Sequence, residues 1–148
     1  MTGAIHILNG PNLNRLGVRE PEIYGHTTLA EVQTICETAA GHVPVVFRQS
    51  NLEGEIVSWI HQAIDEGACA ILINPAGLTF TSVAILDALK MFPGPVVEFH
   101  ISNIHRRDPI YHNSLVSKVA TAVMAGLGAE GYALGVRAAL DLAARGAR

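Results

Sequence analysis

Short apolar runs alternate along this chain with longer stretches in which apolar residues recur at helical spacing. Continuous apolar runs are typical of strands buried on both faces, and a repeat of three to four residues is typical of helices packed on one side. The pattern predicts strands at residues 4–8, 44–48, 70–74, 95–99 and 119–125. It predicts helices over residues 29–40, 53–66 and 82–91, and a last helix from residue 127 onward.

Signals for helix ends support this division. Thr27 or Thr28, followed by Glu31, resembles a capping box at the start of the first helix, and Gly41 is a plausible stop. Gly67 closes the second helix in the same way.

The alternation of strands and helices predicts the fold class. Buried parallel strands joined by helices form a sheet that is covered on both faces. Five strands in about 150 residues fit a flavodoxin-like three-layer α/β sandwich with strand order 2-1-3-4-5. No linker, repeat or low-complexity segment interrupts the pattern, so we expect a single domain over residues 1–148.

Composition narrows the classes of partner. The chain is 49% hydrophobic and only 16% charged, with a mean hydropathy of +0.31. Because monomers rarely expose large apolar patches, this balance favours a homo-oligomer. A net charge of −3 without a basic stripe argues against a nucleic-acid partner.

Targeting and cysteine signals are weak. The first ten residues lack a charged region before the first strand, and no apolar run is long enough to span a membrane. Cys36 and Cys69 are too few for a disulfide scaffold, and each lies in an apolar pattern typical of a buried free thiol. We therefore expect a cytoplasmic protein with no membrane partner.

The segment from residue 9 to residue 25 is the most unusual part of the chain. It reads NGPNLNRLGVREPEIYG and has little apolar periodicity, and loops of this length are usually functional. A phenol is a poor base near neutral pH, but a guanidinium within about 4–6 Å favours the phenolate. Arg19 and Tyr24 could therefore form an activated base, and the alternative is a solvated lid with a packed tyrosine.

Two further polar segments follow predicted strands, at residues 74–81 and 98–105. In a sheet of this order, ligands bind outside the carboxyl ends of the strands, at the switch point between strands one and three. We therefore expect these segments and the first loop to meet at one crevice.

Candidate roles can be assigned within this crevice. His100 suits acid–base chemistry, or is simply a satisfied, half-buried histidine. Asn74 could orient a substrate hydroxyl or cap the following turn. The backbone of Ile101 and Ser102, with the Ser102 hydroxyl, suits a carboxylate, although an ordinary turn would look the same. Glu98 is expected to pair with a neighbouring polar group, because a lone buried carboxylate is costly.

The sequence gives no support for a metal or cofactor site. The histidines show no metal-ligand spacing, and no glycine pattern for a phosphate or dinucleotide is present, so neither a metal nor a cofactor is expected.

Tyr24 as base and His100 as acid suit the removal of a proton α to a carbonyl, followed by loss of a β-hydroxyl as water. Asn12 could help bind the enolate through a water molecule.

The chain resembles the type II 3-dehydroquinate dehydratase (type II dehydroquinase) family over nearly its whole length. The resemblance rests on several motifs in the same order: NGPNLNRLGxREPxxYG at 9–25, QSNxEG at 49–54, NPAGLT at 74–79, TSVA at 81–84, EFHISN at 98–103 and GLGAEGY at 126–132.

The resemblance implies a metal-free trans-dehydration of 3-dehydroquinate through an enolate, in a dodecamer built from trimers. It implies Tyr24 as proton acceptor, activated by Arg19, and His100 as proton donor. Asn12 would hold the enolate water, Asn74 the departing hydroxyl, and Ile101 with Ser102 the carboxylate. Asp87 of a neighbouring subunit would reach the far side of the site. The pathway would be aromatic amino acid biosynthesis or quinate breakdown.

Three positions depart from the family pattern. Phe80 replaces a histidine and Tyr111 an arginine, both of which face the ring hydroxyls in the family, and Leu86 replaces another arginine. The distal end of the site has therefore lost two polar groups. This leaves open a related β-hydroxy ketone acid with a less polar distal side as the substrate. A binding protein without catalysis is a lesser alternative, which the retained base and acid disfavour.

Overall fold

The computed structural model describes residues 3–148 and contains a five-stranded parallel sheet. Its strands pair in the order β2-β1-β3-β4-β5, as the sequence predicts. The register sets Asn9 at the end of β1 beside both Gln49 and Asn74. The strands are β1 (Ile5–Asn9), β2 (Val45–Gln49), β3 (Ala70–Asn74), β4 (Val96–His100) and β5 (Ala122–Ala125).

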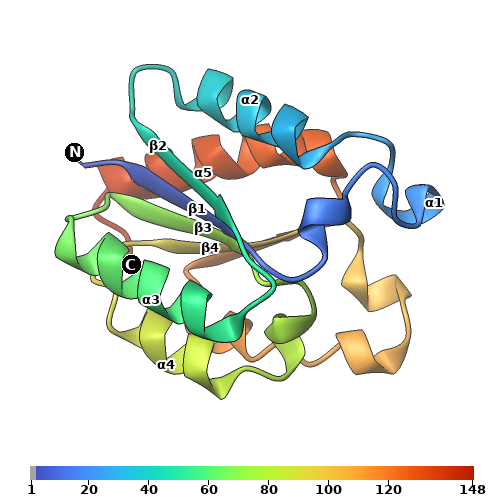
Figure 1. Cartoon of the computed structure of the whole chain (residues 1–148). Helices are drawn as coiled ribbons and strands as arrows, with labels where there is room; N and C mark the ends of the chain where they lie inside the picture. Colours follow the sequence, from blue (N-terminus) through green and yellow to red (C-terminus); the bar gives the residue numbers. More distant parts are fainter. Residues whose placement is uncertain (1–2) are drawn as a thin grey trace.

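Helices cover both faces of the sheet, which gives three layers (Figure 1). Helices α2 (Leu29–Ala40) and α5 (Tyr132–Ala144) lie on one face, and α3 (Glu53–Asp65) and α4 (Val83–Lys90) lie on the other. An apolar cluster lies on each face of the sheet. Successive residues of a strand pack into one cluster and then the other, because side chains alternate across a strand. This is why the strands read as continuous apolar runs.

Short elements gather at the carboxyl ends of the strands. The loop after β1 contains a 3-10 turn and then α1 (Pro21–Tyr24), which projects from the sheet at that end (Figure 1). The segments after β3 and β4 are built from further 3-10 turns: η2 (Ala76–Phe80), η3 (Ile104–Arg106) and η4 (Pro109–Tyr111). The fold thus places irregular, polar chain where parallel sheets bind ligands.

Three predicted strands are displaced by one residue. The strands expected from residues 4, 44 and 95 begin one residue later and continue through Asn9, Gln49 and His100. Pro44 and Pro95 lack an N–H, so only their carbonyls join the ladder, accepting from the backbone N–H groups of β1 and β3. The shift makes Asn9 and His100 the last residues of their strands.

The carboxyl-terminal part of the prediction needs a larger correction. The strand expected at 119–125 is confined to Ala122–Ala125, and the helix expected from residue 127 begins at Tyr132. Gly126 and Gly128 have φ values of 88° and 75°, a conformation that interrupts regular structure between the two elements.

Predicted helix ends agree more closely. The Glu31 N–H donates to the Thr28 hydroxyl at 3.2 Å and the Glu31 carboxylate accepts from the Thr28 N–H at 3.4 Å, so the capping box is confirmed at Thr28. Gly41 follows the helix with a φ of 62°. The helices expected at 53–66 and 82–91 are shorter by one residue at the carboxyl end and by one at each end, respectively.

Cys36 is a buried free thiol, and burial raises its pKa to about 12. Cys69 is also free but only half-buried, which corrects the expectation for that residue because it precedes β3 rather than lying within it. Within residues 3–148, the helices are too short or too polar to cross a membrane.

Candidate active site

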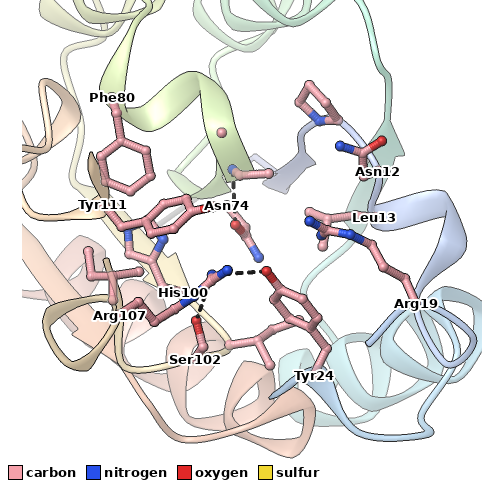
Figure 2. A pocket seen from close by; sticks show the side chains of 15 residues that line it. Asn12, Leu13, Arg19, Tyr24, Asn74, Phe80, His100, Ser102, Arg107 and Tyr111 are labelled. Atoms are coloured by element: carbon pink, nitrogen blue, oxygen red, sulfur yellow. Dashed lines mark hydrogen bonds between the residues drawn. The ribbon is translucent and has the colours of Figure 1, made fainter. Parts of the chain in front are cut away.

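The carboxyl ends of the strands enclose a cavity of about 250 Å³ (Figure 2). The three polar segments singled out in the sequence all contribute to its lining, so the predicted convergence is confirmed. The predicted residues that line it are Asn12, Arg19, Tyr24, Asn74, Phe80, His100, Ile101, Ser102 and Tyr111.

Tyr24 ends α1 and turns its hydroxyl toward the cavity (Figure 2). The guanidinium of Arg107 donates to this hydroxyl through Nη1 at 2.9 Å. Arg19 instead lies against the ring, with its Cζ atom 4.9 Å from the centroid, and pairs with Glu20 at 3.6 Å. Two guanidinium groups thus lie against the phenol.

The contact between Arg107 and the candidate base, Tyr24, was not predicted from the sequence. The chain carries two adjacent arginines, and the pattern of residue types does not show which one faces inward. In the structure Arg106 is exposed, whereas Arg107 adopts extended backbone just after η3 and turns into the cavity. Ser102 accepts a second, longer hydrogen bond from Arg107 Nη1 at 3.4 Å.

His100 is buried at the end of β4 and is held by Glu98. The two residues share one face of the strand because side chains two residues apart point the same way. The distance from His100 Nε2 to Glu98 Oε2 is 2.5 Å, which confirms the predicted partnership. Hydroxyls of Ser114 and Ser117, which the sequence reasoning did not connect to this site, donate to the same carboxylate at 2.9 and 2.6 Å.

These hydrogen bonds fix the charge on Glu98. Burial acts to raise the pKa of its carboxyl, but the bonds from His100, Ser117 and Ser114 outweigh burial and lower the pKa below its usual value. Glu98 is therefore an anion that can only accept, so His100 Nε2 carries a proton. The other ring nitrogen, Nδ1, is left as the one available to a ligand.

Asn74 is held by a buried chain of hydrogen bonds. Its Nδ2 donates to the Tyr132 hydroxyl at 3.0 Å, which donates to Asn9 Oδ1 at 2.8 Å. Burial raises the pKa of Tyr132, so that hydroxyl stays protonated. Asn74 Oδ1 also accepts from the Ala76 N–H at 3.2 Å. Asn74 therefore caps the turn and lines the cavity. Its role toward a substrate hydroxyl stays a prediction.

The loop that carries Asn12 is fastened to the segment after β2. Asn12 has a φ of 72°, a left-handed conformation that asparagine tolerates well. Its backbone N–H donates to Asn51 Oδ1 at 2.9 Å, and Gln49 Nε2 donates to the Gly10 carbonyl at 3.2 Å. Through these contacts the QSN motif, although distant in sequence from the other segments, supports the loop at the rim of the cavity.

The distal wall is aromatic. The Phe80 and Tyr111 rings meet edge to face with centroids 5.5 Å apart, and Phe80 stacks on His100 at 6.4 Å. Leu86, the third departure from the family pattern, is buried on α4.

Asp87 lies outside the cavity of its own chain. Its side chain on α4 is 64% exposed and pairs with Lys90 at 3.6 Å. Its predicted approach to a neighbouring subunit's site stays a prediction. In the part of the chain from residue 3 onward, no three histidine, cysteine, aspartate or glutamate side chains gather closely enough to hold a metal ion.

Comparison with known proteins agrees with this geometry. Residues 3–140 match the family described as dehydroquinase class II. The chain belongs to this family. A 3-dehydroquinate dehydratase of Cereibacter sphaeroides is 56% identical over 148 residues, covering 99% of this chain and 100% of that protein. A 3-dehydroquinate dehydratase of Streptomyces coelicolor is 57% identical, covering 96% and 92%.

Solved structures of the family share the fold. The type II dehydroquinase from Propionibacterium acnes superposes with a TM-score of 0.87 at 42% identity, covering 93% of this chain and 95% of that one. The type II dehydroquinase from Butyrivibrio crossotus gives 0.87 at 35% identity, covering 92% and 96%. The match to the family over residues 3–140 includes all five strands and the residues that line the cavity.

Proposed function

We propose that this chain dehydrates 3-dehydroquinate to 3-dehydroshikimate, in aromatic amino acid biosynthesis or in quinate breakdown. The observation that carries the proposal is the placement of Tyr24, hydrogen-bonded by Arg107 at 2.9 Å, in the same cavity as the His100–Glu98 pair. A base and an acid on one cavity suit an elimination of water. The relatives from Cereibacter sphaeroides and Streptomyces coelicolor are 3-dehydroquinate dehydratases.

In this mechanism Tyr24, as a phenolate, removes the proton α to the ketone. The C–H electron pair forms the enolate, whose oxygen Asn12 stabilises through a water molecule. Both guanidinium groups, of Arg107 and of Arg19, lie against Tyr24, where their positive charges would stabilise the phenolate that takes the proton. Their fixed positions mean that little reorganisation is needed at the moment of reaction.

In the second step the enolate collapses and the β C–O bond breaks. His100, acting as an imidazolium, gives its Nδ1 proton to the departing hydroxyl, which leaves as water, and the new C=C bond is conjugated with the ketone. Asn74, oriented by Tyr132, binds that hydroxyl. The backbone N–H groups of Ile101 and Ser102 and the Ser102 hydroxyl hold the substrate carboxylate.

We place this chain in a dodecamer of trimers in which Asp87 of one subunit reaches the site of another. Its exposure on α4 supports such a role. Large apolar side chains at either end of α4 are also exposed, Val83 by 57% and Met91 by 55%, as expected for a helix that contacts another subunit.

Purified protein is expected to convert 3-dehydroquinate at about 1 s⁻¹ or faster, with a KM below about 1 mM, since most enzymes work in this range. The absorbance of the enone product follows the reaction. A folded protein that shows no turnover at millimolar substrate would contradict the proposal.

The aromatic distal wall favours a second candidate, a β-hydroxy ketone acid without the distal diol. Phe80 cannot hydrogen-bond a substrate hydroxyl, and each unpaired buried hydroxyl costs about 1–3 kcal/mol. Under this candidate the double change Phe80→His with Tyr111→Arg should lower the KM for 3-dehydroquinate about tenfold or more. A double variant with normal melting and an unchanged or higher KM would exclude it.

Glu98→Gln is expected to lower kcat about 10- to 100-fold, with a smaller change in KM. The amide preserves the shape but no longer supplies the negative charge that orients and supports the His100 imidazole. Steady-state kinetics across pH measure the effect, with melting temperature as a check on the fold. An unchanged kcat would show that His100 does not depend on this carboxylate.

A further inference from the structure

The guanidinium of Arg107 lies between two phenol rings. Its Cζ atom is 4.2 Å from the centroid of the Tyr111 ring and 5.5 Å from that of Tyr24 (Figure 2). The shorter distance is that of a guanidinium stacked closely on an aromatic face. Tyr111 is therefore in closer face contact with this cation than the base itself.

Stacking and hydrogen bonding act on Arg107 in different directions. A planar guanidinium can rest its face on a ring while its N–H groups donate in its own plane. Arg107 uses Nη1 for the Tyr24 hydroxyl at 2.9 Å and the Ser102 hydroxyl at 3.4 Å. The ring of Tyr111 thus limits rotation of the group that donates to the base.

Tyr111 is itself fixed by its surroundings. Phe80 meets its ring edge to face, at a centroid distance of 5.5 Å and an interplanar angle of 72°. Its backbone N–H donates to the Asp108 carbonyl at 2.9 Å, within a 3-10 turn that starts at Pro109. The His112 ring contacts the Arg107 carbonyl at 2.8 Å, which fastens this turn to the arginine backbone. The ring is thus a fixed support.

We propose that Tyr111 is a positioning residue for the base: its ring holds the Arg107 guanidinium on the Tyr24 hydroxyl. The inference rests on the proposed function of Tyr24. Tyr111, which stands where the family pattern has an arginine, would then act at the reacting end of the cavity, because its aromatic face rather than a charged group packs against Arg107.

Charged or titratable groups other than Arg107 also lie near Tyr24, and a test of Tyr111 must distinguish their effects from that of Arg107. Arg19 faces its ring at 4.9 Å, and Glu20 pairs with Arg19 at 3.6 Å. His100 lines the same cavity. None of these groups is altered by a change at Tyr111, so a shift in the titration of Tyr24 would report the position of Arg107.

The chain has three tyrosines, which makes a direct measurement possible. In Tyr111→Phe and Tyr111→Leu only Tyr24 and Tyr132 remain, and burial raises the pKa of Tyr132. The first step in phenolate absorbance on raising the pH therefore belongs to Tyr24 in both variants, and Tyr24→Phe in each background verifies this. The measurement needs no substrate, so it remains valid even if 3-dehydroquinate is not turned over.

The step is expected at a pH about 0.5 to 1 higher in Tyr111→Leu than in Tyr111→Phe, which keeps the ring. The kcat/KM of the leucine variant should be about 3- to 10-fold lower than that of the phenylalanine variant below this pH, with the acidic limb of the pH profile displaced in the same direction. Tyr111→Met serves as a second aliphatic variant if Tyr111→Leu does not fold. The exposed neighbour change Ile110→Ala should leave the profile unmoved.

The proposal would be overturned if the first step in phenolate absorbance came at the same pH in Tyr111→Leu and Tyr111→Phe. If that shared pH also differed from the parent's, the tyrosine hydroxyl rather than the ring would be responsible. A loss of activity with coincident steps would likewise overturn it and assign Tyr111 to substrate contact alone.

Discussion

Replacing Tyr24 with phenylalanine is expected to reduce kcat for 3-dehydroquinate by about 10³-fold or more. The change removes the only atom of this side chain that can take a proton, while the ring keeps its contact with Arg19. General base catalysis contributes about 10²–10⁴-fold. The enone absorbance measures the loss.

The Tyr24→Phe variant should retain its melting temperature and its affinity for the product, since Tyr24 is only half-buried. Calorimetric titration with 3-dehydroshikimate checks the second point. Residual kcat above about a tenth of the parent value would refute the role of Tyr24 as base. Loss of product binding together with turnover would instead assign it to ligand contact.

Arg107→Met is expected to lower kcat/KM about 100-fold and to displace the acidic limb of the pH profile to higher pH. Methionine fills much of the same space against Tyr111 but cannot donate to the Tyr24 hydroxyl, which Arg107 reaches at 2.9 Å. Loss of one preorganised donor to a catalytic oxyanion typically costs about 10²–10³-fold. The pH dependence of kcat/KM is the measurement.

Arg106→Met is the matched control. It removes the same charge one residue earlier, from an exposed side chain that does not line the cavity, so its kinetics should match those of the parent protein. If both variants lose activity equally, the effect is one of overall charge. If Arg107→Met alone is normal, Arg19 is sufficient to hold the phenolate.

The sheet was largely predictable because its signals are local. A buried strand such as Ala70–Asn74 is apolar on both faces, and the capping box at Thr28 needs only four residues. The carboxyl-terminal region was less predictable because its apolar residues continue across Gly126 and Gly128. Their backbone angles, rather than hydrophobicity, separate β5 from α5.

The candidate site divides in a similar way. Tyr24, Asn74 and His100 could be placed together from the sequence because the carboxyl ends of parallel strands share one edge. The supporting contacts could not be predicted. Tyr132 lies 58 residues beyond Asn74 yet donates to Asn9 and accepts from Asn74. Ser117 reaches Glu98 from a 3-10 turn, residues Val116–Lys118, whose position no local pattern specifies.

The sequence by itself determined the order of the strands, the edge of the sheet where the candidate site lies and the residue types that line it. It could do so because the hydrophobic period of each element can be recognised from neighbouring residues. Only the tertiary structure decided that Arg107, rather than its neighbour Arg106, donates to Tyr24, and that Tyr111 stacks on it. Such choices depend on side-chain direction and on contacts between distant segments. Distances of a few ångströms, which govern hydrogen bonds and charge interactions, arise only when the chain is folded.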